Sequence, residues 1–98
     1  MRVFISQPMS GLDEMEVYAV RNKICNKFHI TNSELIENYK KDFIPKKDVN
    51  DHVWGLGDSI KLMAFADLVI FAPGWKKARG CLIEHDICGL YDIPYIEV

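Results

Sequence analysis

Apolar and polar residues alternate along the chain in short blocks, which predict four strands and three helices. The expected strands are apolar runs at residues 2–5, 33–39, 68–72 and 94–98. The expected helices, in which apolar side chains recur every three or four positions, lie at residues 12–28, 56–66 and 79–91. The polar segment at residues 40–52 contains Pro45 and predicts an exposed loop. Strands that alternate with helices in this way predict an α/β fold with a parallel sheet.

This order of elements favours a three-layer arrangement in which helices cover both faces of a sheet of about four strands. Right-handed crossovers leave few strand orders, and we expect the order 2-1-3-4. Ligands of such sheets bind at the carboxyl ends of the strands, where the strand order reverses. In this chain the reversal lies between the first and third expected strands, next to the loops "SQPMSG" and "APGWKKARG".

The composition is that of one soluble globular domain, residues 1–98. The formal net charge is -2, and 49% of the residues are hydrophobic. The lack of a basic surplus argues against a nucleic-acid partner, and no apolar run approaches the roughly 20 residues of a membrane span. We expect no secretory signal. The three cysteines, Cys25, Cys81 and Cys88, are odd in number and form no Cys-x-x-Cys pair, which favours free thiols and a cytoplasmic location.

The first loop combines side-chain hydrogen-bonding groups with two residues that shape the backbone. Its hydroxyl and amide groups can bind a ligand, its glycine permits close approach to the backbone, and the following helix offers unpaired N–H groups to an anion. The structural alternative is a simple turn with a serine cap, and the loop alone leaves the two interpretations level. The candidate binding residues are Ser6, Gln7, Pro8, Met9, Ser10 and Gly11.

The second loop favours a binding site because it places an aromatic ring among cations. Trp75 can stack on a base or a ring, and Lys76, Lys77 and Arg79 can pair with a phosphate. A turn that only reverses the chain needs none of these side chains. The candidate binding residues here are Gly74, Trp75, Arg79 and Gly80.

Glu84 is the candidate reactive group of the third expected helix. The predicted apolar stripe of this helix is Ile83, Ile87, Leu90 and Tyr91, and Glu84 lies on its flank, about one turn from the helix start. A half-buried carboxylate beside a ligand cleft can act as nucleophile or general base. The alternative is a surface glutamate that interacts with the helix dipole.

The same helix carries Cys81, His85 and Cys88 at a spacing that metal ligands could use. A structural zinc site needs four ligands, and no second Cys/His pair stands elsewhere in the sequence. We therefore expect no metal and no cofactor, and we expect His85 to line the ligand pocket.

The segments "VFISQPMSG" and "ADLVIFAPGWKKARGCLIEHDI" resemble the nucleoside 2-deoxyribosyltransferase-like superfamily, in its short phage and bacterial branch related to 2'-deoxynucleoside 5'-phosphate N-hydrolases. The resemblance covers nearly the whole chain. It implies a flavodoxin- or Rossmann-like parallel sheet and a homodimer or larger homo-oligomer. It also implies that Glu84 is the nucleophile, that Asp58 matches the assisting aspartate, and that Ser6–Gly11 contact the sugar and its 5' end.

The function that these observations predict is cleavage of an N-glycosidic bond, or transfer of deoxyribose, on a 2'-deoxynucleoside or its 5'-phosphate. Trp75 would then stack on the base, and Arg79 would help to hold the 5' end. The alternative is a non-catalytic protein that senses or sequesters a nucleotide. The sequence leaves open the base, the acceptor and the need for a 5'-phosphate.

Overall fold

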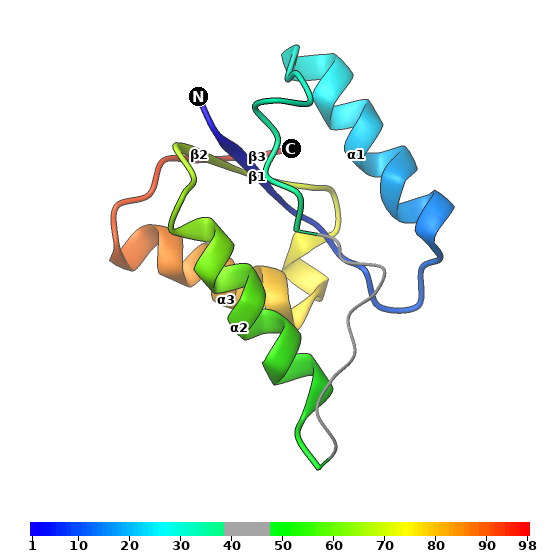
Figure 1. The fold of residues 1–98 in the computed structure, drawn as a ribbon, viewed down its shortest axis with the longest axis vertical. Helices are drawn as coiled ribbons and strands as arrows, with labels where there is room; N and C mark the ends of the chain where they lie inside the picture. The colour runs from blue at the N-terminus through cyan, green and yellow to red at the C-terminus, as the bar shows by residue number, and fades with distance from the viewer. Residues whose placement is uncertain (39–47) are drawn as a thin grey trace.

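The structure is a computed structural model that describes residues 1–38 and 48–98 of the chain. Its elements, in order, are β1 (Val3–Ser6), α1 (Glu14–Phe28), α2 (Asp51–Met63), β2 (Leu68–Phe71), the 3₁₀ helix η1 (Trp75–Lys77), α3 (Arg79–Leu90) and β3 (Tyr95–Glu97) (Figure 1). The three strands form one open parallel sheet in the order β1-β2-β3. The fold is therefore α/β with a small parallel sheet, as the alternation of strands and helices predicts.

The strand expected at residues 33–39 is reduced to a single parallel bridge between Leu35 and Val3. The backbone N–H of Val3 donates to the carbonyl of Glu34, and the N–H of Ile36 donates to the carbonyl of Val3, both at 2.8 Å. Beyond this bridge the side chain of Asn38, rather than a backbone N–H, donates to the β1 backbone. Only a short piece of chain pairs there, because a turn occupies the residues immediately before it. Within the described residues the sheet has three strands and not four.

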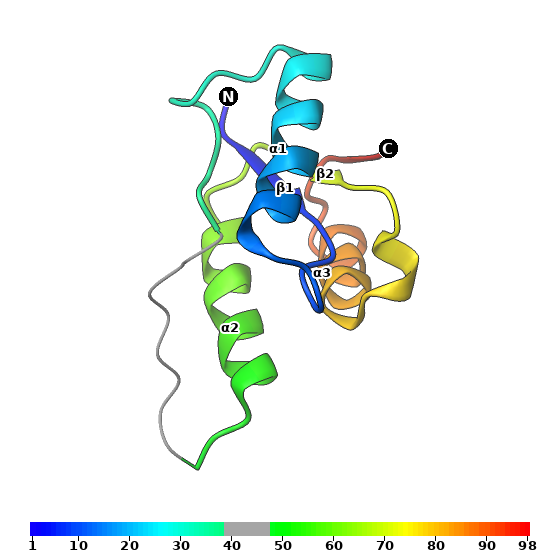
Figure 2. The same cartoon turned by 90° about the vertical axis from the view of Figure 1, so that its right-hand side faces the viewer.

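Alternate side chains of the strands enter two separate apolar clusters on opposite faces of the sheet. On one face Phe4 packs with Met63 of α2 and Cys88 of α3. On the other face Ile5 packs in a cluster with Ile24 of α1. Figures 1 and 2 show the corresponding arrangement, with α1 on one side of the strands and α2 and α3 on the other. This alternation directs the last residue of β1, Ser6, toward the α3 side.

A capping box fixes the start of α1 two residues later than the apolar pattern predicts. Asp13 Oδ1 accepts a hydrogen bond from the N–H of Glu16 at 2.8 Å, and Glu16 Oε1 accepts one from the N–H of Asp13 at 3.4 Å. Carboxylates near this end of a helix interact favourably with its dipole. The N-terminus of α1, which the sequence predicts as a site for an anionic ligand, therefore already interacts with the carboxylates of Asp13 and Glu16.

The second helix begins earlier than expected, at Asp51, because the side chain of Asn50 caps it. Asn50 Oδ1 accepts a hydrogen bond from the N–H of Val53 at 3.1 Å. The end of the predicted loop 40–52 is therefore helical, while residues 40–47 of that loop lie outside the described residues. In residues 1–38 and 48–98, none of the helices combines the length and the apolar character needed to cross a bilayer.

Helix α3 packs through a different face from the one that its apolar side chains indicate. The predicted stripe is wrong at three of its four positions, because Ile83, Leu90 and Tyr91 are 43%, 77% and 75% exposed. Ile87 alone among them is partly buried and packs against the core. The buried positions are instead Cys81, Glu84 and Cys88. The two thiols are small, so they allow the helix to lie close to the sheet. This orientation takes Glu84 from the flank of the helix into the interior of the protein.

Candidate functional site

The structure brings Ser6 and Glu84 into direct contact. Ser6 ends β1, and Glu84 lies in the second turn of α3, 78 residues further along the chain. The hydroxyl of Ser6 donates a hydrogen bond of 2.7 Å to Glu84 Oε1. Both residues are buried, with 1% and 6% of their surfaces exposed. A carboxyl group in the interior, bonded to a hydroxyl at the carboxyl end of a parallel strand, is the centre of the candidate site.

Burial raises the pKa of Glu84 to about 7, because the charged carboxylate loses its hydration. The hydrogen bond from Ser6 acts in the opposite direction, since it stabilises the charged form. Burial also raises the pKa of the Cys81 thiol, and it raises that of Cys88 to about 11. Both thiols are therefore neutral near pH 7, where Glu84 exchanges its proton. Perturbed carboxyl groups of this kind are frequent among general bases and nucleophiles.

The two loops that the sequence singles out lie against each other. A Cβ atom built on Gly74 would lie 3.6 Å from Cγ of Pro8. Gly74 and Gly11 have φ angles of 86° and 78°, a conformation that favours glycine. In the first loop Met9 is half-buried, whereas Ser10 and Gly11 are exposed. The contact between the loops places the expected ligand-binding residues at the same edge of the sheet as Glu84.

Gln7 points to the opposite face of the sheet from its neighbour Ser6. Its Nε2 donates a hydrogen bond of 3.0 Å to the carbonyl of Val17 in α1. The side chain is buried, and its Oε1 has no hydrogen-bond partner within the described residues. In this structure Gln7 attaches the first loop to α1 and does not face Glu84.

Trp75 and His85 form an aromatic cluster next to the site. Their rings stack with centroids 4.3 Å apart and planes inclined by 10°. The rings of Phe71 and Tyr95 lie 4.9 Å and 4.7 Å from that of His85. His85 Nε2 lies 2.8 Å from Glu97 Oε2, which joins α3 to β3. Trp75 is only 9% exposed. The indole that the sequence assigns to base stacking thus packs in the protein interior with one face against His85.

Positive charge gathers where η1 leads into α3. Lys76, Lys77 and Arg79 are exposed on this segment. The residue that caps α3, Ala78, supplies no side-chain hydrogen bond, so the first N–H groups of the helix lack a side-chain cap. Gly80, in that first turn, faces α2: a Cβ atom there would lie 3.9 Å from a methyl group of Leu56. An anion fits this end of α3 better than the carboxylate-capped end of α1.

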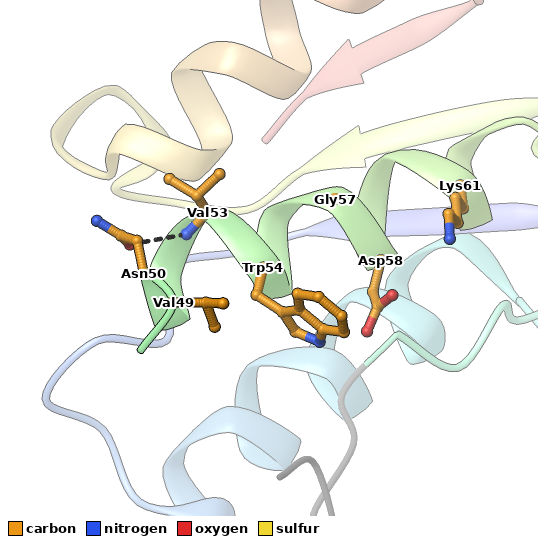
Figure 3. Close-up of a pocket in the computed structure, with 7 residues that line it drawn as sticks. All are labelled: Val49, Asn50, Val53, Trp54, Gly57, Asp58 and Lys61. Atoms are coloured by element: carbon orange, nitrogen blue, oxygen red, sulfur yellow. Dashed lines mark hydrogen bonds between the residues drawn. The ribbon is translucent and has the colours of Figure 1, made fainter. Parts of the chain in front are cut away.

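Asp58 lines a separate hollow on α2. The hollow has a volume of about 340 Å³, and Figure 3 shows its lining residues, Val49, Asn50, Val53, Trp54, Gly57, Asp58 and Lys61. Leu56 points toward Gly80 of α3, and Asp58 stands two positions after Leu56, which corresponds to about 200° of helix rotation. Asp58 therefore faces away from α3. The structure does not bring Asp58 and Glu84 together.

Arg21 is a buried polar residue that the sequence analysis missed. Arg21 is 1% exposed. Its guanidinium donates to Oδ1 of Asn38, whose Nδ2 donates to the carbonyl of Ile5 at 3.1 Å. Burial lowers the pKa of Arg21, and the charge of Glu37 opposes this shift. The helical spacing of α1 could have indicated its burial, because Arg21 stands one turn after the buried Val17 and lies on the same face of the helix. The residue connects α1 to the outer edge of β1.

Comparisons with protein-family models, with curated proteins and with solved structures each found no match. The functional conclusion therefore depends on the chemistry of the site.

Proposed function

We propose that this protein cleaves the N-glycosidic bond of a 2'-deoxynucleoside or its 5'-phosphate, or transfers the deoxyribosyl group, with Glu84 as nucleophile. The observation that carries the proposal is the buried carboxyl group of Glu84, hydrogen-bonded to Ser6 at the carboxyl end of β1. Ligands of parallel sheets bind at this end of the strands. The proposal includes a flavodoxin- or Rossmann-like relationship of the fold, which the resemblance of the sequence implies.

The chemistry requires a carboxylate at the sugar. As the bond between the anomeric carbon and the base breaks, its electron pair leaves with the base nitrogen and positive charge develops on the carbon. Ionised Glu84 would attack that carbon and form a deoxyribosyl ester, while the departing base takes up a proton from solvent water. Water, which returns a proton to the solvent, or a second base would then attack the same carbon, break the ester C–O bond and release the carboxylate. A pKa of about 7 leaves Glu84 partly ionised at neutral pH, and such a carboxylate is more basic than an exposed one.

The charges around the site support an anionic substrate. Lys76, Lys77 and Arg79 are exposed beside the N-terminus of α3, which has no side-chain cap. A 5'-phosphate would interact favourably with these cations and with the helix N–H groups.

The three free cysteines support a location in a reducing compartment such as the cytoplasm.

A non-catalytic nucleotide-binding protein is the second candidate. The separation of Asp58 from Glu84 favours it, because Asp58 then does not assist departure of the base. In that case the same cations would hold the phosphate, and the sugar–base bond would remain intact.

Incubation with a panel of 2'-deoxynucleosides and their 5'-monophosphates, followed by chromatography for free base, tests the proposal. We expect base release, faster from a monophosphate than from its nucleoside at low salt, with the difference shrinking as salt screens the exposed cations. Replacing Lys76 and Lys77 with Ala should reduce the preference for the monophosphate, whereas Lys23→Ala on α1 should not. Nucleotide binding without base release would support the second candidate. A protein that neither binds nucleotide nor releases base would overturn both candidates.

We also propose that the protein is a homodimer that uses the apolar side chains left exposed on α3. Leu90 and Tyr91 are 77% and 75% exposed at the end of this helix, and Ile83 is 43% exposed. Light scattering at micromolar concentration should give twice the monomer mass, and Leu90→Glu should give the monomer. Met15→Glu is the matched control, because Met15 is 82% exposed on α1, so this variant should remain a dimer. A monomeric wild type would contradict the proposal.

A further inference from the structure

We propose that Ser6 is a positioning residue for Glu84, and that its hydroxyl fixes Oε1 of the carboxylate so that Oε2 is the atom presented to the sugar. The inference rests on the proposed function, because it assigns the orientation of the proposed nucleophile. It gives Ser6 a role that differs from the substrate contact expected from the sequence.

The anchor is rigid because Ser6 belongs to the sheet. Its backbone pairs with Phe71 of β2, and its carbonyl accepts a hydrogen bond of 2.9 Å from the N–H of Ala72. The side chain of Glu84 has three rotatable bonds, so its carboxylate could occupy several rotamers without a partner. The bond of 2.7 Å from a fixed strand to one carboxylate oxygen selects one of them. Reacting groups held in this way lose less freedom on reaching the transition state.

A neighbouring thiol lies beside the same hydroxyl. Cys81 stands one helical turn before Glu84 on the buried face of α3. Burial raises the pKa of its thiol, and interaction with the Ser6 side chain opposes this shift. The hydroxyl of Ser6 has one proton, and that proton is directed to Glu84. The carboxylate of Glu84, rather than the neutral thiol, therefore receives the hydrogen bond of Ser6.

The surroundings leave the Ser6 hydroxyl as the group that stabilises the ionised form of Glu84. On α3 the nearby titratable groups are the neutral thiols of Cys81 and Cys88. β1 contributes the hydroxyl itself. The buried residues that the other elements supply to the cluster around the two thiols are Phe4, Met63, Val69, Phe71 and Trp75. The cations Lys76, Lys77 and Arg79 are exposed, and His85 lies against Glu97. Within the described residues, the Ser6 hydrogen bond is the interaction that opposes the effect of burial, so its loss should raise the pKa of Glu84.

Ser6→Ala, Ser6→Cys and Ser6→Thr test the role, with Cys81→Ala as a control that removes a small polar group beside the same hydroxyl. The pKa of Glu84 is measured directly in the free protein by ¹³C NMR of its carboxyl carbon, and kcat and KM are measured against pH. We expect Ser6→Ala to raise the pKa by about one to two, the size expected for a hydrogen bond to a charged group. It should lower kcat about ten- to a hundredfold, with a smaller change in KM. The acid limb of the profile of kcat against pH should shift to higher pH.

The remaining variants make the outcome independent of a folding defect. Ser6→Thr keeps the hydroxyl and should restore the wild-type pKa, while Ser6→Cys, with a weaker donor of similar size, should give an intermediate value. Cys81→Ala should change the pKa much less than Ser6→Ala does. An unchanged pKa in Ser6→Ala or in Ser6→Cys, with the protein folded by its NMR spectrum, would overturn the inference. A raised pKa in a protein that releases no base would retain the Ser6–Glu84 bond and reject the proposed function.

Discussion

The Glu84→Gln variant is expected to release free base at least about 10⁴-fold more slowly than the wild type, with little loss of nucleotide affinity. Glutamine has the size of glutamate and can still accept a hydrogen bond from Ser6, but its amide cannot form the deoxyribosyl ester. The carboxylate is needed only as charge develops at the sugar carbon, so its loss acts on turnover rather than on binding. For a phosphorylated ligand the affinity should rise slightly, because a negative charge leaves the site.

Base release and nucleotide binding should be measured on the same preparations of both proteins. Asp86→Asn is the matched control, since it makes the same carboxyl-to-amide change at an exposed position of the same helix, and it should retain wild-type turnover. Unchanged base release in Glu84→Gln would remove this residue from the mechanism. If neither protein releases base and both bind nucleotide equally, the site is one for binding.

The second large effect concerns stability. The free energy of unfolding should decrease by about 3 kcal/mol between about pH 4.5 and pH 7 through Glu84 alone. The pKa of its carboxyl is raised from 4.5 to about 7 by burial. Below pH 4.5 the carboxyl is protonated in both the folded and the unfolded chain. As the pH rises, the unfolded chain releases this proton first, so unfolding becomes more favourable until the folded protein also ionises near pH 7.

Urea denaturation of the wild type and of Glu84→Gln at several pH values from 4 to 8 measures this contribution as a difference. The variant cannot ionise at this position, so the stability of the wild type relative to the variant should decrease with pH and level off above pH 7. The same comparison with Asp86→Asn should show no decrease of this kind. A difference between wild type and Glu84→Gln that stays constant with pH would show that the carboxyl has an ordinary pKa.

Much of the fold could be predicted from local patterns in the sequence. β1 and β2 are nearly continuous apolar runs that are buried on both faces, and the α3 boundaries agree within one residue with those expected. The strand predicted at residues 33–39 is wrong, since only the bridge at Leu35 forms in the part of it that the structure describes. Leu35 and Ile36 are its apolar centre, but within the described residues backbone pairing ends there and the Asn38 side chain occupies the next acceptor of β1. A side-chain donor in place of a backbone N–H leaves no periodic pattern in the sequence, so the pattern of apolar residues could not predict it.

The site residues were partly predictable, and their contacts were not. Spacing along α3 shows which residues share a face, but it does not show which face packs on the sheet. The set Cys81, Glu84 and Cys88 has nearly the same helical spacing as the more apolar set that contains Ile83 and Leu90, and the less apolar set is the buried one. The bond between Ser6 and Glu84 depends on that choice, because rotating the helix to bury Ile83 would turn Glu84 away.

Asn38 and Glu97 have a consequence for association between molecules. An open sheet offers unpaired backbone groups along both outer strands, and such edges can recruit strands from other chains and start aggregation. On the β1 side, Val3 is bridged to Leu35 and the carbonyl of Ile5 is bonded to Asn38. On the other side, β3 has only three residues and carries the carboxylate of Glu97 next to His85. Both edges are therefore poor templates for strand addition, so a sheet this small can remain open without growing into a fibre.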